Sequence, residues 1–220
     1  MTGIPTVAMP QDVAVRLAGI ARQVAVSAGN EVPSQEDGAT IAILHAGRLA
    51  VVVDDEARRS RIIALVQEGD AVVLPSPDWP GTLGMRCRAV VDSSVLVIPS
   101  RIDDLIASDP EAGSWLIRAL AAGVADREQS AAIALEPRVE RRLLLKLRQL
   151  AERWGRVTPE GVRLDLRVTH QELADMVGAA RESITLALGG LRDQGEIDVQ
   201  HRTVVIRHMA DQDATATDTA

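Results

Sequence analysis

The sequence contains no Phe and no Tyr, and its only aromatic residues are three Trp, so an apolar core has to be built from Val, Leu, Ile and Ala. No apolar run reaches the roughly 18 residues of a membrane-spanning helix. The segment MTGIPTVAMPQD lacks the charged start and long apolar stretch of a signal peptide. Cys87 is the only cysteine, which excludes an intrachain disulfide. We therefore expect a globular protein of the cytoplasm that does not bind membranes.

Charge is unevenly distributed along the chain, although the net charge of −7 taken alone argues against a nucleic-acid partner. Residues 1–136 carry 11 Lys or Arg and 18 Asp or Glu, whereas residues 137–208 carry 13 and 10. The tail, 209–220, adds three Asp and no base. A phosphate-binding surface would therefore belong in residues 137–208, although so small a positive excess is also ordinary for a domain.

The N-terminal part begins with a short helix and continues as strands. QDVAVRLAGIA (11–21) places apolar residues at helical spacing. β-rich runs follow at 22–32, 40–55, 59–74 and 85–99. Five glycines punctuate them: Gly29, Gly38, Gly47, Gly69 and Gly81. Strands at this spacing, with glycine at the turns, predict a compact β-barrel or β-roll over residues 1–108.

Two helices are predicted after the strands, a short one at 101–108 and a long one at 109–136. Asp109 can cap the long helix, and Pro110 suits its first position. Its apolar stripe is Leu116, Leu120 and Val124. Three small residues would let another helix approach closely: Ala119, Ala122 and Gly123. The pattern leaves two alternatives open, a helix that packs on its own β-roll or one that pairs with a second copy of the chain.

A second region begins at Pro137, where we place the domain boundary. Pro137 breaks the long helix and suits the first position of the next one, PRVERRLLLKLRQLAERW. The apolar stripe of that helix is Val139, Leu143, Leu147 and Leu150, and Gly155 is expected to end it. The tail, 209–220, is small, polar and acidic, a composition typical of disorder.

The stretch THQELADMVGAARESITLALGGL, residues 169–191, predicts two short helices around a glycine. Thr169 and Glu172 have the spacing of a capping box, and Gly178 can adopt the left-handed conformation that ends a helix. In the second helix, Ile184, Leu188 and Leu191 share the inward face. IDVQHRTVVIR (197–207) then alternates as a small β-hairpin. Helix, tight turn, helix and hairpin predict a winged helix-turn-helix over residues 137–208.

Arg181 and Glu182 lie at the exposed start of the second helix, the end that enters the DNA major groove in such folds. Arg can donate two hydrogen bonds to guanine, and Glu can accept one from cytosine. Another interpretation is a solvated surface pair worth at most about 1 kcal/mol. The order of capped helix, glycine turn, second helix and wing favours base reading.

VTHQELADMVGAARESITLALGGLRDQGEI resembles the helix-turn-helix signature of the Crp/Fnr family of bacterial transcription regulators. More weakly, GDAVVL and the glycine-punctuated strands resemble a cyclic-nucleotide-binding-type β-roll. DPEAGSWLIRAL is similar to the start of the long dimerisation helix of that family. The resemblance implies an α+β fold, a homodimer on near-palindromic double-stranded DNA, and RNA polymerase as a partner.

The resemblance also assigns roles to single residues. Arg181 and Glu182 match the base-reading positions of the family. Positions that contact phosphate are matched by Thr169, His170 and Gln171, and Ser183 stands where a hydroxyl residue is common. We expect the wing residues His201 and Arg202 to contact the backbone as well. Two departures are Ala180, where a phosphate-contacting Ser is frequent, and Leu186, where many members carry a second base-reading Arg. Leu186 would instead contact a thymine methyl group.

The segment GDAVVLPSPDWPGTLGMRCRA departs from the cAMP-binding pattern of the family. In cAMP-responsive members a Gly-Glu-Leu segment and an Arg-Ser or Arg-Thr pair hold the ribose and the phosphate, whereas here the corresponding residues are 73–75 and 83–84. Arg86 and Arg88 lie at alternate positions of one strand, where both can point outward. We therefore expect no cAMP binding. Two alternatives stay open: a regulator with a degenerate pocket that is active without an effector, and one that binds an unidentified ligand. Trp79 could cover such a pocket or could anchor a packed loop.

Other sensors and other classes have little support in the sequence. A single cysteine excludes an iron–sulfur cluster held within one chain, and Cys87 is more typical of a buried small residue than of a thiol switch. His45, the only histidine in residues 1–136, is expected at a strand turn, a poor position for an axial haem ligand. A metal enzyme on a cupin-like β-roll would need several clustered histidine and carboxylate ligands, which this region lacks. We expect a regulator without metal and without enzymatic activity. The rival class is a protein-interaction module that does not bind DNA.

Overall fold

The computed structural model describes residues 7–33, 40–54, 59–74, 85–98, 102–200 and 203–209. The chain divides into two compact units, one ending at Glu128 and the other beginning at Gln129. Within these residues no helix is long and apolar enough to cross a membrane. The expected tail lies outside the described residues from position 210 onward.

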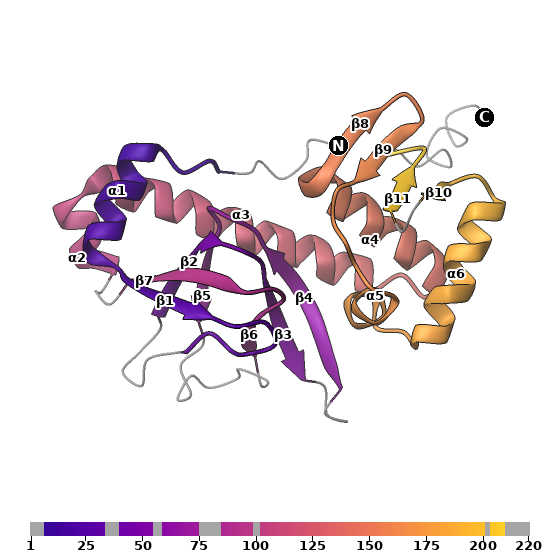
Figure 1. The fold of residues 1–220 in the computed structure, drawn as a ribbon, viewed down its shortest axis with the longest axis horizontal. Helices are drawn as coiled ribbons and strands as arrows, with labels where there is room; N and C mark the ends of the chain where they lie inside the picture. The colour runs from indigo at the N-terminus through magenta and orange to yellow at the C-terminus, as the bar shows by residue number, and fades with distance from the viewer. Residues whose placement is uncertain are drawn as a thin grey trace, which may run out of the picture. The chain divides into compact units, whose positions relative to one another are not determined.

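The first unit contains seven described strands and three helices (Figure 1). The helices are α1 (Gln11–Ile20), α2 (Ile102–Ser108) and α3 (Pro110–Ala134), and the last residues of α3 belong to the second unit. The strands are β1 (Arg22–Val26), β2 (Thr40–Ala46), β3 (Leu49–Asp54), β4 (Ser60–Val66), β5 (Ala71–Leu74), β6 (Arg86–Ala89) and β7 (Ser93–Ile98). They form two antiparallel sheets, with strand orders β1-β7-β2-β5 and β4-β3-β6. The predicted β-roll is confirmed.

The central strands of the roll are apolar on both faces because both faces are buried. On β7, Val95 and Val97 contribute to the core between the sheets, whereas Leu96 and Ile98 pack on the opposite face against α1 and α3. Alternate side chains of a strand point to opposite faces, which accounts for this division. The left-handed φ angles of Gly29, Gly47 and Gly69, at 85°, 100° and 85°, place them at the expected turns. Gly38 and Gly81 lie outside the described residues.

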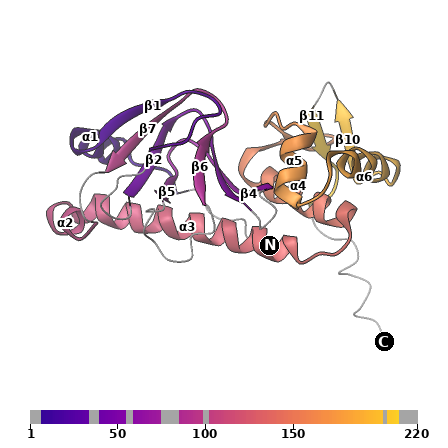
Figure 2. The ribbon, with the colours of Figure 1, turned by 90° about the horizontal axis from the view of Figure 1, so that it is seen from below.

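Helix α3 packs along its own β-roll with part of its surface (Figure 2). Asp109 caps it: its carboxylate accepts a hydrogen bond from Ala112 N at 3.1 Å. That bond, together with Arg16, holds the pKa of Asp109 below its usual range. The buried residues of α3 on the roll are Ala112, Trp115, Leu116 and Ala119.

Two of the three small residues of α3 face the roll of the same chain. Ala119 is buried in the roll's own core, and a Cβ added at Gly123 would lie 3.6 Å from the carbonyl oxygen of Ala71 in β5. Ala119 and Gly123 therefore allow close approach of the roll of the same chain. The predicted single stripe is also wrong in part, because Leu116 is buried while Val124 is 45% exposed.

The second unit contains the remaining helices and a four-stranded antiparallel sheet of order β10-β11-β9-β8. Its elements are α4 (Val139–Trp154), β8 (Gly155–Thr158), β9 (Gly161–Leu164), α5 (His170–Val177), α6 (Arg181–Asp193), β10 (Ile197–Gln200) and β11 (Thr203–Ile206). The winged helix-turn-helix is confirmed. Helix α4 begins at Val139, after Arg138 as its N-cap, so the expected start at Pro137 is wrong by two residues.

Polar side chains lie buried along α4 and join it to its neighbours. Lys146, the only lysine of the chain, donates from Nζ to Ser130 Oγ and to Gln149 Oε1, each at 2.8 Å. Arg148 donates to the carbonyl oxygen of His208 at 2.9 Å and to Glu196 at 3.2 Å. Because Glu196 precedes β10 and His208 follows β11, Arg148 fixes both ends of the wing on α4.

Gly189 and Gly190 in α6 allow a matched test of stability. An added Cβ at Gly189 meets nothing within 4 Å, whereas at Gly190 it would lie 2.7 Å from Glu140 Oε1. Glycine within a helix costs roughly 0.5–1 kcal/mol relative to alanine. Gly189→Ala is therefore expected to raise the free energy of unfolding by about that amount, and Gly190→Ala by less because Glu140 must move. Urea unfolding of both variants measures the difference; equal gains would contradict the crowding at Gly190.

Candidate nucleic-acid interface

Helix α5 is placed by its two ends. Thr169 Oγ1 accepts a hydrogen bond from Glu172 N at 3.1 Å, and Glu172 Oε2 accepts one from Thr169 N at 2.7 Å, the reciprocal pair of a capping box. Gly178 ends the helix with φ 69° and ψ 45°. Leu173, Ala174 and Val177 are buried. The local sequence therefore sets both the start of α5 and the turn that leads to α6, as predicted.

Helix α6 has a buried face and an exposed face. Ile184, Leu188 and Leu191 are buried, as their spacing predicted. The exposed side chains at its start are Arg181, Glu182, Thr185 and Leu186, and Leu186 is 77% exposed. Ala180, the N-cap, gives no side-chain hydrogen bond to the helix. The structure thus brings the three predicted base-reading residues together on the exposed side of one helix.

The side chains of Arg181 and Glu182 differ from those of most charged residues in having no hydrogen bond or ion pair among the described residues. By contrast, Arg16 contacts Asp12, Asp109 and Glu111 at 2.7–2.9 Å. Other paired arginines are Arg86 and Arg148. An exposed guanidinium and carboxylate with no protein partner can bind base edges without breaking an existing contact. This is the arrangement that direct readout in the major groove requires.

The expected phosphate-contacting residues lie close by at the start of α5. Thr169, His170 and Gln171 are exposed, and Gln171 Nε2 donates to Asp175 at 2.8 Å. Ser183 is half-buried. The wing is formed by β10 and β11, and its tip residues His201 and Arg202 lie outside the described residues. The described residues therefore place four of the six expected phosphate contacts, at the first turns of α5 and α6.

Two features of this surface were not identified from the sequence. Thr185 Oγ1 lies 3.0 Å from His170 Nδ1, a contact between the two helices that no spacing rule reveals. Its position four residues after Arg181 was the available signal. The second feature is Arg192, exposed at the last turn of α6 and 3.7 Å from Asp193. Thr185 was expected on the exposed side of α6 but was given no role, and Arg192 extends that side beyond the predicted residues.

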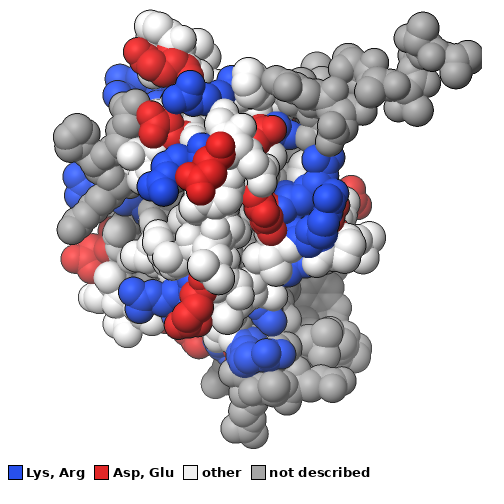
Figure 3. Space-filling model, turned by 90° about the vertical axis from the view of Figure 1, so that its right-hand side faces the viewer, with Lys and Arg blue, Asp and Glu red and all other residues white. Residues whose placement is uncertain are grey.

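Positive and negative side chains are mixed on one face of the described residues. In the face that Figure 3 presents, Lys and Arg side chains are interspersed with Asp and Glu. On β8 and β9, Arg156 and Arg163 both contact Asp165, at 3.0 and 3.2 Å. Sequence preference would therefore depend on particular base contacts more than on general attraction to phosphate.

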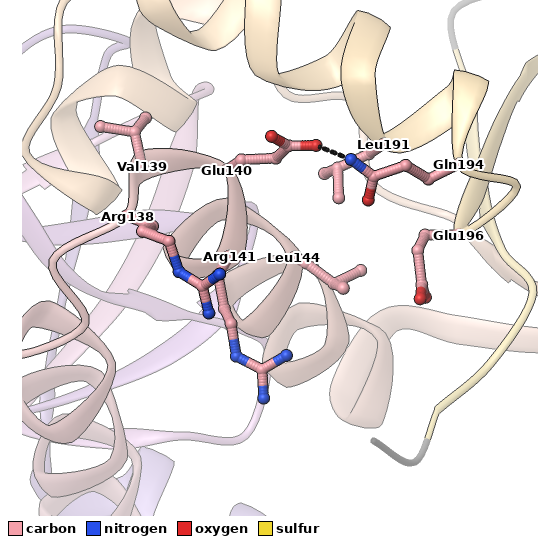
Figure 4. Close-up of a pocket in the computed structure, with 8 residues that line it drawn as sticks. All are labelled: Arg138, Val139, Glu140, Arg141, Leu144, Leu191, Gln194 and Glu196. Carbon is pink, nitrogen blue, oxygen red and sulfur yellow. Dashed lines mark hydrogen bonds between the residues drawn. The ribbon is translucent and has the colours of Figure 1, made fainter. Parts of the chain in front are cut away.

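A pocket of about 480 Å³ lies at the opposite end of α6, beside the first turn of α4 (Figure 4). It is lined by Arg138, Val139, Glu140, Arg141, Leu144, Leu191, Gln194 and Glu196. Glu140 accepts a hydrogen bond from Gln194 at 2.6 Å, and Glu196 pairs with Arg148 at 3.2 Å. Because its carboxylates already have partners within the protein, we assign this pocket no ligand.

The fold and the exposed start of α6 define a winged helix-turn-helix transcription regulator. Residues 138–211 match the Crp-like helix-turn-helix domain. The chain is 30% identical over 148 residues to the regulatory protein CysR of Synechococcus elongatus, covering 64% of this chain and 69% of that protein. The chain belongs to the Crp/Fnr family of DNA-binding transcription regulators. The rival class of a module that does not bind DNA is therefore set aside.

Other relatives match over shorter stretches or in fold alone. The CRP-like cAMP-activated global transcriptional regulator of Mycobacterium tuberculosis is 32% identical over 101 residues, which span 46% of this chain and 45% of that one. Several solved structures share the fold at low sequence identity. A CooA variant from Carboxydothermus hydrogenoformans has a TM-score of 0.73 at 17% identity and covers 88% and 87% of the two chains. FixK2 from Bradyrhizobium japonicum has 0.67 at 18%, covering 86% and 94%.

Proposed function

We propose that this regulator binds a near-palindromic site as a homodimer, with one α6 helix reading each half-site. The observation that carries the proposal is the exposed pair Arg181 and Glu182, which have no protein partner among the described residues. Arg181 would bind guanine O6 and N7, and Glu182 would accept from cytosine N4. Leu186 adds an apolar contact. These residues predict a half-site with at least one G·C pair beside an A·T pair.

The start of α5 would fix the position of α6 on the DNA backbone. Thr169, His170 and Gln171 lie at a helix N-terminus, where N–H groups and the helix dipole favour phosphate. Ser183 and the wing residues His201 and Arg202 complete the expected backbone contacts. Such contacts determine register and orientation but carry no sequence information themselves.

A stripe of α3 that does not face the roll supports the homodimer. Ile117 and Val124 are 50% and 45% exposed, and the exposed Ala121 lies between them. Their spacing, four and then three residues, is that of a two-helix seam. In a twofold dimer each residue of the stripe would meet its counterpart or near neighbour on the second copy. The alternative of a helix that only packs on its own roll leaves these side chains in water.

The roll supports a regulator that does not require cAMP. Cys87 and Ala89 point into its core, whereas Arg86 alternates with them and pairs with Asp54 and with Glu31 at 2.9 Å. That guanidinium already has carboxylate partners, and the core between the sheets is aliphatic. Both features are poorly suited to a cyclic phosphate, which needs a free cation and backbone donors. Residues 75–84, which include Trp79 and positions 83–84, lie outside the described residues.

Cys87 is expected to be unreactive in the folded protein. It is buried between the sheets, and this burial raises the pKa of its thiol to about 12. The thiolate is the reactive form, so alkylation by iodoacetamide at pH 8 should be very slow in the native protein and fast in urea. Rapid alkylation under native conditions would contradict the buried position and reopen a thiol switch.

In-vitro selection of duplex DNA by the purified protein, with no small molecule added, tests the proposed function. We expect enrichment of a twofold site with half-site centres about one helical turn apart. Addition of cAMP should not alter the result. Enrichment that appears only with cAMP would overturn the proposal that the regulator does not require cAMP. If no site is enriched even after cAMP or cell extract is added, sequence-specific binding is overturned.

RNA polymerase is the second partner that membership of the family implies, and a cytoplasmic location follows if the target is chromosomal DNA. The direction of regulation depends on where the selected site lies relative to a promoter. Transcription by purified polymerase from a template that carries the selected site, with and without the protein, measures that direction.

A further inference from the structure

The exposed side of α6 changes character one turn after its start. Arg181 and Glu182 are followed, four residues later, by Thr185 and Leu186. One helical turn advances about 5.4 Å, whereas stacked base pairs are about 3.4 Å apart. Thr185 and Leu186 therefore lie roughly one or two base steps beyond the base pairs that Arg181 and Glu182 would contact.

The hydroxyl proton of Thr185 is already used within the protein. Its Oγ1 lies 3.2 Å from the carbonyl oxygen of Arg181 and 3.0 Å from His170 Nδ1. A threonine hydroxyl has one hydrogen to donate. When His170 Nδ1 carries a hydrogen it donates to Thr185, and Thr185 donates to the Arg181 carbonyl. In the other tautomer Thr185 donates to one of the same two atoms.

While these contacts are kept, Thr185 has no hydrogen left to donate to guanine O6, thymine O4 or a purine N7. What it retains is its γ-methyl group and one lone pair. Leu186 beside it is 77% exposed and has no polar atom in its side chain. An apolar surface in the major groove discriminates through the C5 methyl group of thymine, because adenine, guanine and unmodified cytosine lack that methyl group.

We infer that Thr185 and Leu186 select a thymine methyl group in each half-site, and that His170 is a positioning residue that holds the Thr185 hydroxyl away from the base. This inference rests on the proposed function. It assigns specificity to Thr185 and gives His170 a role besides its expected phosphate contact. The same surface would accept 5-methylcytosine, which carries the methyl group at the same position.

The test removes only the methyl group. Each thymine of the selected half-site is replaced in turn by deoxyuridine, and affinity is measured by fluorescence anisotropy. Burial of one methyl group corresponds to about a fourfold change in affinity, so we expect one position per half-site with a roughly fourfold loss. At that position 5-methylcytosine should also bind more tightly than cytosine.

Variants of Thr185 and Leu186 distinguish the contribution of the methyl groups to thymine recognition from that of the Thr185 hydroxyl. Leu186→Ala and Thr185→Ser, which both remove methyl groups, should reduce the thymine-to-deoxyuridine ratio towards one. Thr185→Val keeps a methyl group and loses the hydroxyl, so it should retain the ratio. His170→Leu should lower the thymine-to-deoxyuridine ratio. His170→Gln, whose amide can donate to the Thr185 hydroxyl, should keep the ratio near the wild-type value. The ratio is insensitive to a uniform loss of phosphate contact, which His170 variants are also expected to cause.

The outcomes distinguish this inference from the function on which it rests. If selection enriches no site, sequence-specific binding fails and the inference fails with it. If a site is enriched but every thymine tolerates deoxyuridine, or the ratio is the same in Leu186→Ala and Thr185→Ser as in the wild type, only the methyl-reading role is overturned.

Discussion

Replacement of Arg181 by Ala is expected to abolish discrimination at one guanine of each half-site while leaving weak, non-specific DNA binding. A bidentate contact from Arg to guanine is worth roughly 1–3 kcal/mol, so preference at that base pair should fall by about fivefold to 150-fold. Affinity for duplexes with each of the four base pairs at each position of the selected site measures the effect. Unchanged preference at every position would contradict the base-reading role.

Arg192→Ala is the matched control because it removes the same charge from the same helix. Arg192 lies at the last turn of α6, exposed and 3.7 Å from Asp193, and not at the end that enters the groove. Loss of a charge near phosphate weakens binding nearly uniformly across sequences and lowers the salt dependence. Arg192→Ala should therefore preserve the ranking of base pairs that Arg181→Ala changes.

The parts of the site that the sequence predicted depend on local chemistry. The capping box joins Thr169 and Glu172, which lie within one helical turn of each other. The left-handed conformation of Gly178 is likewise a property of one residue and its immediate neighbours. The buried positions of α6 follow from helical spacing, because any helix that packs by one face must repeat apolar residues at that period. The exposure of Arg181 and Glu182 is the complement of the same pattern.

The parts that could not be predicted depend on contacts distant in sequence or on competing patterns. GRVTPEGVRL forms the hairpin of β8 and β9, but it is short and has few apolar residues to show alternation. The faces of Ala119 and Gly123 could not be assigned, since small residues suit approach by a sheet as well as by a helix. The contact of His170 with Thr185 joins two helices and has no signature in either one.

Charged substitutions in the exposed stripe of α3 are expected to have the largest effect, which is loss of the dimer. Val124→Asp or Ile117→Asp would place two like charges opposite each other at a twofold interface, where little water screens them. The folded subunit should be almost unaffected, because both side chains are about half exposed in the single chain. We expect these variants to be monomers in sedimentation experiments at concentrations where the wild type is a dimer.

Loss of the dimer should affect DNA binding through geometry, not through the reading residues. Two linked reading helices bind a two-half-site target more tightly than one by about 100-fold to 10,000-fold. Val124→Asp should therefore lose at least about 100-fold in affinity for the full site and little for a single half-site. Val15→Asp, at a 69% exposed position of α1, introduces the same charge away from the stripe and should change neither quantity. A Val124→Asp protein that remains dimeric and keeps full-site affinity would show that α3 does not form the dimer interface, and that its exposed Ile117 and Val124 are ordinary surface residues.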